Sequence, residues 1–159
     1  MIIAIAAYLL VSFAERGDIS MRESQLLNAF GYKFASAPNI AYKGGAGFTY
    51  DVAVPKMLDG RPYNVTYVCR DIGSGEGSCF AQIDWMGTYG PLNYPYVVAP
   101  AHYVVGSGSG ACLDHTGEIN AYSISFYPEQ SDGHLIFRNI GVQAGEQYPT
   151  IEMHCEVAS

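Results

Sequence analysis

The residues that could carry chemistry in this chain are four cysteines, four histidines and one asparagine in an N-x-T triplet. The cysteines are Cys69, Cys79, Cys112 and Cys155, and their spacing contains no C-x-x-C pair, which argues against a structural zinc site. An even number of cysteines in a chain of extracellular character favours disulfides. Of the possible pairings we favour Cys69–Cys79 together with Cys112–Cys155, and four buried thiols are the alternative.

The triplet Asn64-Val65-Thr66 is a potential acceptor of an N-linked glycan in an exported protein. Asp84 and the pair Asp114-His115 could supply acid–base chemistry, but no nucleophile and no metal-ligand spacing accompanies them. The sequence therefore predicts neither an enzyme active site nor a metal site, and no cofactor is expected.

The composition narrows the class of protein. Of 159 residues, 49% are apolar and 14% are charged, which excludes a disordered chain. The net charge of −7 disfavours nucleic acid as a partner. Thirteen tyrosines and 18 glycines in a chain with few lysines are typical of extracellular β-proteins. We therefore expect an extracellular location.

The first 14 residues contain no charged side chain, and in a helix their apolar residues would cover every face. Such a helix is about 21 Å long, too short to cross a bilayer. There are three alternatives for this segment: a signal peptide, a core helix, or an assembly helix that packs against copies of itself. The lack of a basic residue before the apolar run disfavours the signal peptide. We favour the assembly helix, with contacts through Ile2, Ile3, Ile5, Ala6, Leu9, Leu10 and Phe13.

An amphipathic pattern continues beyond this apolar block, with Ile19, Leu26, Leu27, Phe30 and Phe34 recurring at helical spacing. Proline disfavours helix both at its own position and at the preceding residue, so Pro38 predicts a helix end near residue 37. A helix of about 36 residues would be about 54 Å long, and half of it must protrude from a domain of this size.

After Pro38 the pattern changes to short alternating segments separated by glycine and proline. These segments predict antiparallel strands packed as a sandwich. The expected fold is therefore α+β, with a long protruding N-terminal helix (residues 1–38) followed by an antiparallel, immunoglobulin-like β-sandwich head (residues 39–159). The expected strands are residues 48–54, 63–69, 79–85, 120–127, 133–140 and 150–157, and a strand over 95–105 that is interrupted at Pro100.

The uninterrupted N-terminal helix and the segment 40–55 that follows it resemble the archaeal type IV pilins, which are exported with class III signal peptides. The segment has Tyr42 at the helix end, a glycine-rich turn at 44–47, an alternating strand and then Pro55. The resemblance covers roughly residues 1–60. It implies a structural subunit that polymerises into an extracellular helical filament of identical copies, waits in the membrane before assembly and serves adhesion.

Two other functions remain open. One is a membrane-anchored β-sandwich that binds a glycan or a protein, with Tyr94, Tyr96 and Trp85 as candidate exposed contacts. For each of these aromatic residues, packing in the core or along a strand is the favoured alternative. The other, less favoured, is a secreted enzyme. A pilin should form thin filaments, whereas a binding module should remain monomeric in detergent.

Overall fold

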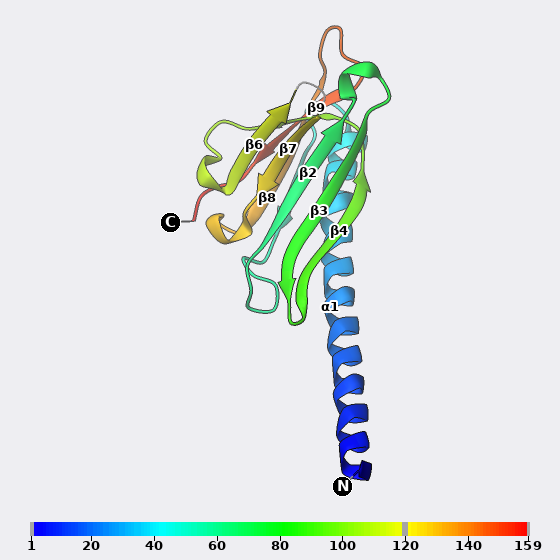
Figure 1. Cartoon of the computed structure of the whole chain (residues 1–159). Helices are drawn as coiled ribbons and strands as arrows, with labels where there is room; N and C mark the ends of the chain where they lie inside the picture. Colours follow the sequence, from blue (N-terminus) through cyan, green and yellow to red (C-terminus); the bar gives the residue numbers. More distant parts are fainter. Residues whose placement is uncertain (1, 119–120, 159) are drawn as a thin grey trace.

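The computed structural model describes residues 2–118 and 121–158, and side chains are described for residues 11–73, 75–115 and 122–158. The chain forms one long helix, α1 (Ile2–Gly44), followed by a head of two β-sheets (Figure 1). This is the expected α+β organisation. The N-terminal part of α1 extends away from the head, and the C-terminal part lies along the sheets (Figure 1).

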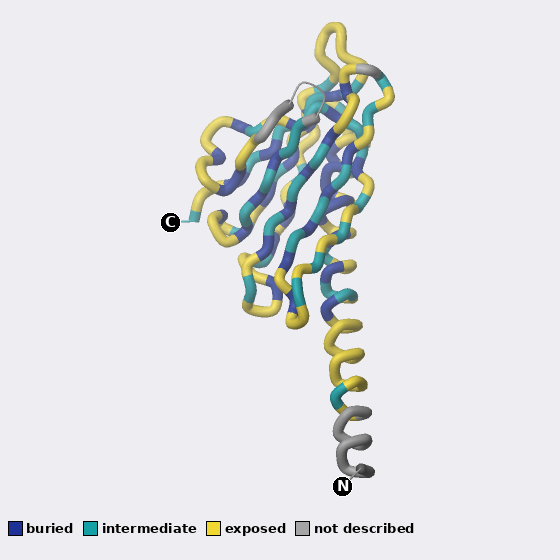
Figure 2. The backbone as a smooth tube through the Cα atoms, viewed as in Figure 1, coloured by how far each residue is buried: buried dark blue, intermediate teal, exposed yellow. Residues whose placement is uncertain are grey.

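The half of α1 that contacts the head buries one stripe of side chains. Glu23, Leu27, Gly31, Phe34 and Ala41 are all buried, and their spacing of three, four or seven residues places them on one face of the helix. Before residue 23 no described side chain is buried (Figure 2). Residues 2–15, about 20 Å of helix, therefore extend beyond the first contact with the head, which Arg16 makes with Tyr89.

The helix does not end near residue 37, and this prediction was wrong. It continues through Pro38 to Gly44. Pro38 has no N–H group, so the carbonyl of Phe34 loses its partner within the helix. The hydroxyl of Tyr67, a buried residue, donates a hydrogen bond to that carbonyl at 3.1 Å. At the end of the helix, the side-chain amide of Asn139 donates to the carbonyls of Ala41 and Tyr42 in the same way.

The head contains a four-stranded sheet in the order β1-β8-β9-β5 and a five-stranded sheet in the order β4-β3-β2-β7-β6. Within the second sheet all described pairs are antiparallel, whereas β5 and β9 in the first sheet are parallel. The strands are β1 (Thr49–Ala53), β2 (Tyr63–Arg70), β3 (Ser78–Gly87), β4 (Gly90–Val98), β5 (His102–Val105), β6 (Leu113–Glu118), β7 (Ala121–Phe126), β8 (His134–Val142) and β9 (Pro149–His154).

Three details differ from the expected sandwich. The segment 95–105 is not one interrupted strand, because the chain leaves the second sheet after β4 and enters the first sheet as β5. Pro100 lies in this crossover, where the backbone N–H of Ala99 donates to the Asn39 side chain at 2.6 Å. Strand β6 was not predicted, because its Asp-His-Thr-Gly sequence does not alternate between apolar and polar residues. The parallel β5–β9 pair departs from the all-antiparallel expectation.

The core lies between the two sheets, and α1 contributes to it. Tyr67 of β2 stacks on Tyr103 of β5 and meets Phe137 of β8 edge-on, with ring centroids 6.0 and 5.6 Å apart. Phe34 of α1 packs against the rings of Tyr63 and Phe126 in the second sheet. The helix contacts both β4 and β1, the edge strands of the two sheets, so it closes one side of the head.

Two disulfides are present, with the pairing favoured from the sequence. Cys69–Cys79 joins directly opposed residues of β2 and β3. Cys112–Cys155 joins the turn before β6 to the residue that follows β9, and it therefore ties the two sheets together. All four cysteines are buried.

Candidate assembly surface on the protruding helix

The protruding part of α1 exposes large apolar side chains. Of the predicted assembly residues, Phe13 has a described side chain, and 68% of it is exposed; its neighbour Val11 is 56% exposed. The side chains of Ile2, Ile3, Ile5, Ala6, Leu9 and Leu10 lie outside the described residues, although their backbone is helical. In the part of the helix that is described, no stretch combines the length and apolarity needed to cross a bilayer. Among the described side chains of this segment, the exposed Val11 and Phe13 have the character of a contact surface.

Charged residues follow the apolar block where α1 approaches the head. Glu15, Arg16, Asp18 and Arg22 are exposed. The guanidinium of Arg16 lies over the ring of Tyr89, 5.6 Å from its centroid, at the tip of the β3–β4 hairpin. This cation–π contact brings the hairpin against the helix about two turns before the buried stripe begins.

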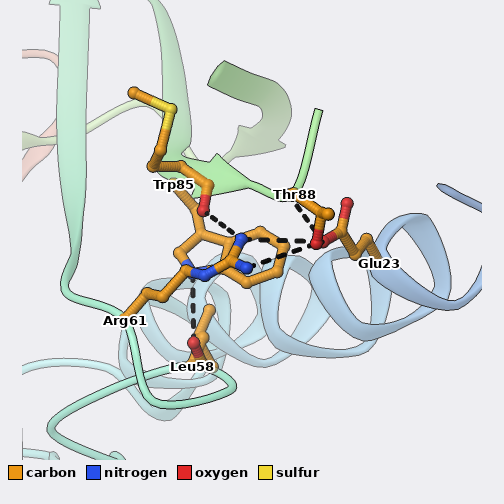
Figure 3. Close-up of polar contacts among 6 residues, drawn as sticks. Glu23, Leu58, Arg61, Trp85 and Thr88 are labelled. Atoms are coloured by element: carbon orange, nitrogen blue, oxygen red, sulfur yellow. Dashed lines mark hydrogen bonds and ion pairs between the residues drawn. The ribbon is translucent and has the colours of Figure 1, made fainter. Parts of the chain in front are cut away.

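Glu23 forms the first buried contact between α1 and the head. Only 7% of this residue is exposed, and its carboxylate accepts hydrogen bonds from the backbone N–H of Thr88, at 2.7 Å, and from the Thr88 hydroxyl (Figure 3). The guanidinium of Arg61 lies 3.7 Å from the same carboxylate oxygen. A buried carboxylate needs such partners, so the hairpin and Arg61 together make burial of Glu23 possible.

Arg61 extends this network into the head. It donates hydrogen bonds to the carbonyl of Met86 at 3.0 Å and to the Thr88 hydroxyl at 3.3 Å, and it lies over the ring of Trp85 (Figure 3). The indole N–H of Trp85 donates to the carbonyl of Leu58 at 3.1 Å. Through these contacts the β1–β2 loop, strand β3 and the helix hold one another in place.

A groove of about 580 Å³ lies at this junction. Its helix wall is formed by Ile19, Arg22 and Leu26, and its head wall by Asp59 and Thr88. Asp59 and Gly60 both have positive φ angles, in a turn closed by paired hydrogen bonds between Leu58 and Arg61. This turn holds Asp59 on the groove.

The three aromatic residues named as candidate binding contacts pack inside the molecule, which is the alternative that the sequence analysis favoured for each of them. Trp85 is only 3% exposed. Tyr94 and Tyr96 are half-buried because this face of β4 lies against α1. The Tyr94 and Ser24 hydroxyls are 3.3 Å apart, and the Tyr96 hydroxyl donates to the Asn28 side chain at 2.9 Å. These aromatic residues therefore attach the helix to the head.

The remaining residues singled out from the sequence are dispersed over the head. Asn64 is half-buried on β2, opposite Asp84 of β3. His115 lies on β6, and its ring is tilted against that of Tyr122, with 6.2 Å between the centroids. Within the described residues, no group of three or more histidine, cysteine, aspartate or glutamate side chains could hold a metal ion.

One exposed histidine has a defined acidic partner. His134 Nδ1 lies 2.9 Å from the carboxylate of Asp51, its neighbour across the edge of the first sheet. This hydrogen bond and the negative charge of Asp51 raise the pKa of His134 above 6.5. Both side chains are exposed to solvent, so the two residues form a surface ion pair when His134 is protonated.

The sequence analysis did not identify the junction residues Glu23, Arg61 and Thr88. One signal was available for Glu23, because it lies four residues before Leu27 on the apolar face of the helix. An acidic residue at such a position needs a buried partner. The partners come from a hairpin 65 residues further along the chain, and sequence spacing does not reveal that contact.

The fold and the candidate surface define a β-rich head carried on a helix that extends well beyond it. Comparison with known proteins adds no family to this description: no family model matches the chain, and neither a curated protein nor a solved structure matches it significantly.

Proposed function

We propose that this chain is the structural subunit of an extracellular helical filament and that it polymerises through its apolar N-terminal helix. The observation that carries the proposal is the extension of residues 2–15 beyond the head, with Val11 and Phe13 exposed to solvent. Burying a large apolar side chain contributes about 1.5 to 3 kcal/mol. The head does not cover this part of the helix, whereas identical copies can.

The shape of the subunit favours an open polymer. A contact between two different surfaces of identical subunits, repeated by rotation and translation, produces a helical filament. The small residues Ala4, Ala6 and Ala7 would allow neighbouring helices to approach closely in the filament core. Before assembly, the same segment would be sheltered in the membrane.

In this proposal the head is an immunoglobulin-like sandwich that forms the outer coat. Two disulfides suit a protein that remains outside the cell, and a glycan on Asn64 would extend from the coat. Together with the resemblance over residues 1–60, these features support a place among the archaeal type IV pilins, with adhesion to surfaces or cells as the role of the fibre.

The test is electron microscopy of the purified full chain, with two substitutions in the apolar segment. We expect thin filaments from the unchanged chain and none from the Ala6→Asp and Leu10→Asp variants, because a carboxylate buried between helices is costly. Val97→Asp is the matched control: Val97 is 73% exposed on the head, so this variant should still assemble.

Circular dichroism and the state of the disulfides would establish that the heads of all variants fold. A chain without residues 1–14 should be a soluble monomer. Intact filaments from Leu10→Asp, or a wild-type chain that stays monomeric under all conditions, would overturn the proposal. Monomers that bind a glycan would instead support an anchored binding module.

A further inference from the structure

One end of the head exposes apolar side chains on two adjacent loops. The β1–β2 loop and the β3–β4 hairpin both lie at the end of the head from which α1 extends (Figure 1). Arg61 of the loop donates hydrogen bonds to the hairpin, so the two lie side by side. Tyr89 at the tip of the hairpin is 54% exposed, Met86 at its base is 58% exposed, and Met57 of the loop is 50% exposed. Apolar side chains gathered in this way at one end of a molecule indicate a contact surface.

Tyr89 lies close to the point on α1 where the uncharged residues end. The hairpin contacts the helix at two levels, through the hydrogen bonds of Thr88 to Glu23 and through the ring of Tyr89, which lies 5.6 Å from the guanidinium of Arg16. Residues 16 and 23 are about 10 Å apart along the helix axis, so Tyr89 is on the side of the hairpin nearer to the N-terminus. The run of 14 uncharged residues ends immediately before Glu15.

A lipid bilayer has layers that match this arrangement. Its hydrocarbon core is bounded on each side by a polar headgroup layer about 5 to 8 Å thick. When the uncharged run lies in hydrocarbon, the charged residues from Glu15 onward enter the headgroup layer. Tyrosine rings favour this layer because they are amphipathic, and arginine can keep its guanidinium hydrated there. The charges of Glu15, Arg16, Asp18 and Arg22 cancel, so lipids without net charge are sufficient.

We propose that the tip of the β3–β4 hairpin lies in the headgroup layer of a lipid bilayer while the uncharged run of α1 is inserted, and that the ring of Tyr89 fixes the depth of the subunit. The inference rests on the proposed function, because it concerns the subunit before assembly, and it adds a contact between the head and the lipid. The position of the ring favours lipid over a second copy as its partner. A bilayer that shelters the uncharged run also surrounds Arg16, and the ring of Tyr89 lies against that residue.

Tryptophan fluorescence can measure this depth, because the chain contains one tryptophan, Trp85, which is only 3% exposed and supplies the background signal. The full chain is placed in phosphatidylcholine vesicles with a quencher either on the headgroup or deep in the acyl chains. In Tyr89→Trp we expect the headgroup quencher to act more strongly, and in Leu10→Trp the acyl-chain quencher. Val97→Trp is the control: Val97 is 73% exposed and lies about 26 Å from Tyr89 along β4, so neither quencher should act.

Vesicle binding tests whether the ring itself contributes. Tyr89→Ser should weaken partition of the full chain into the same vesicles about fivefold, which corresponds to about 1 kcal/mol. Tyr32→Ser is the matched control, because Tyr32 is 68% exposed but lies about 24 Å further along α1 than Arg16. This variant should partition like the unchanged chain, and circular dichroism would establish that both variants fold. Equal partition of Tyr89→Ser and the unchanged chain would overturn the role of the ring.

The outcomes separate this inference from the proposed function. If Leu10→Trp is quenched but Tyr89→Trp is not, the hairpin contact is refuted while insertion of the helix stands. The same holds if the signal of Tyr89→Trp changes only when filaments form, which would assign the tip to a second copy. Equal quenching at positions 89 and 97 would mean that the head lies flat on the membrane, and it would also refute the inference. If no position is quenched, the membrane-bound stage fails with the inference, while the filament is still decided by microscopy.

Discussion

Gly31 and Gly17 lie in the same helix but meet opposite surroundings, so the same substitution should have opposite effects. A Cβ atom added at Gly31 would lie 2.0 Å from the ring of Tyr96, far inside van der Waals contact. A Cβ atom at Gly17 would meet nothing within 4 Å. Gly31→Ala and Gly17→Ala therefore separate the intrinsic helix preference of alanine from the packing of the helix on β4.

The magnitude follows from the contacts of Tyr96. Alanine in place of glycine favours a helix by about 1 kcal/mol. At Gly31 the ring of Tyr96 must move, which breaks its hydrogen bond to Asn28 and its edge-on contact with Tyr32 at 5.5 Å. These losses amount to about 1 kcal/mol each, and overpacking adds about 1 to 3 kcal/mol. After subtraction of the gain in helix propensity, the net effect of Gly31→Ala is a destabilisation of about 2 to 4 kcal/mol.

Thermal unfolding with the disulfides intact measures this effect. For a chain of this size, a loss of about 2 to 4 kcal/mol lowers Tm by roughly 4 to 16 °C. Gly17→Ala should leave the Tm of the head unchanged and raise the helical signal in circular dichroism. In the Gly31→Ala/Tyr96→Ala double variant, the loss of unfolding free energy should be smaller than the sum of the losses in the two single variants, because the new Cβ atom no longer meets the ring of Tyr96. Equal Tm values for the two glycine variants would refute the reasoning.

Two further predictions concern the head. Replacing both cysteines of the Cys112–Cys155 disulfide by alanine should lower the free energy of unfolding by about 4 kcal/mol, and the same change at Cys69–Cys79 should lower it by about 3 kcal/mol, because the Cys112–Cys155 disulfide closes the longer loop. Denaturant unfolding measures both losses. The reverse order would contradict the loop-entropy account. In an NMR titration the pKa of His134 should lie above 6.5 and fall towards 6.5 in Asp51→Asn. Because the pKa of His134 is raised in the folded state, its ion pair with Asp51 stabilises the fold below pH 6.5, and this contribution disappears as the pH rises through the folded-state pKa. If the titration of His134 were the same in Asp51→Asn as in the unchanged chain, the pairing would be excluded.

Local patterns predicted those elements whose side chains alternate between core and solvent. Strand β2 is the clearest case, because Tyr63, Val65, Tyr67 and Cys69 all point inward and the residues between them are polar or half-buried. The protrusion of the helix was also predictable, since its length alone exceeds what the head can cover. In these cases residues close in sequence decide the structure.

Long-range contacts decided what the sequence did not predict. Pro38 would end an isolated helix, but Tyr67, from a strand 29 residues later, supplies the missing hydrogen bond to Phe34. Trp85 was a candidate surface contact because tryptophan occurs both in cores and at interfaces. In the structure its indole N–H donates to the carbonyl of Leu58 in the β1–β2 loop, and the side chain is buried. The junction around Glu23 likewise joins segments that spacing alone cannot bring together.

The bond between Tyr67 and Phe34 also determines how the molecule would carry a mechanical load. Tension applied to the exposed end of α1 would travel along an unbroken helix, first to the contacts with the β3–β4 hairpin and then, through Tyr67, to the buried centre of strand β2. Two residues further on, Cys69 fastens β2 covalently to β3. A pull on the shaft would therefore be distributed across the five-stranded sheet, and the rod would be expected to withstand more force than a helix attached only through a flexible linker.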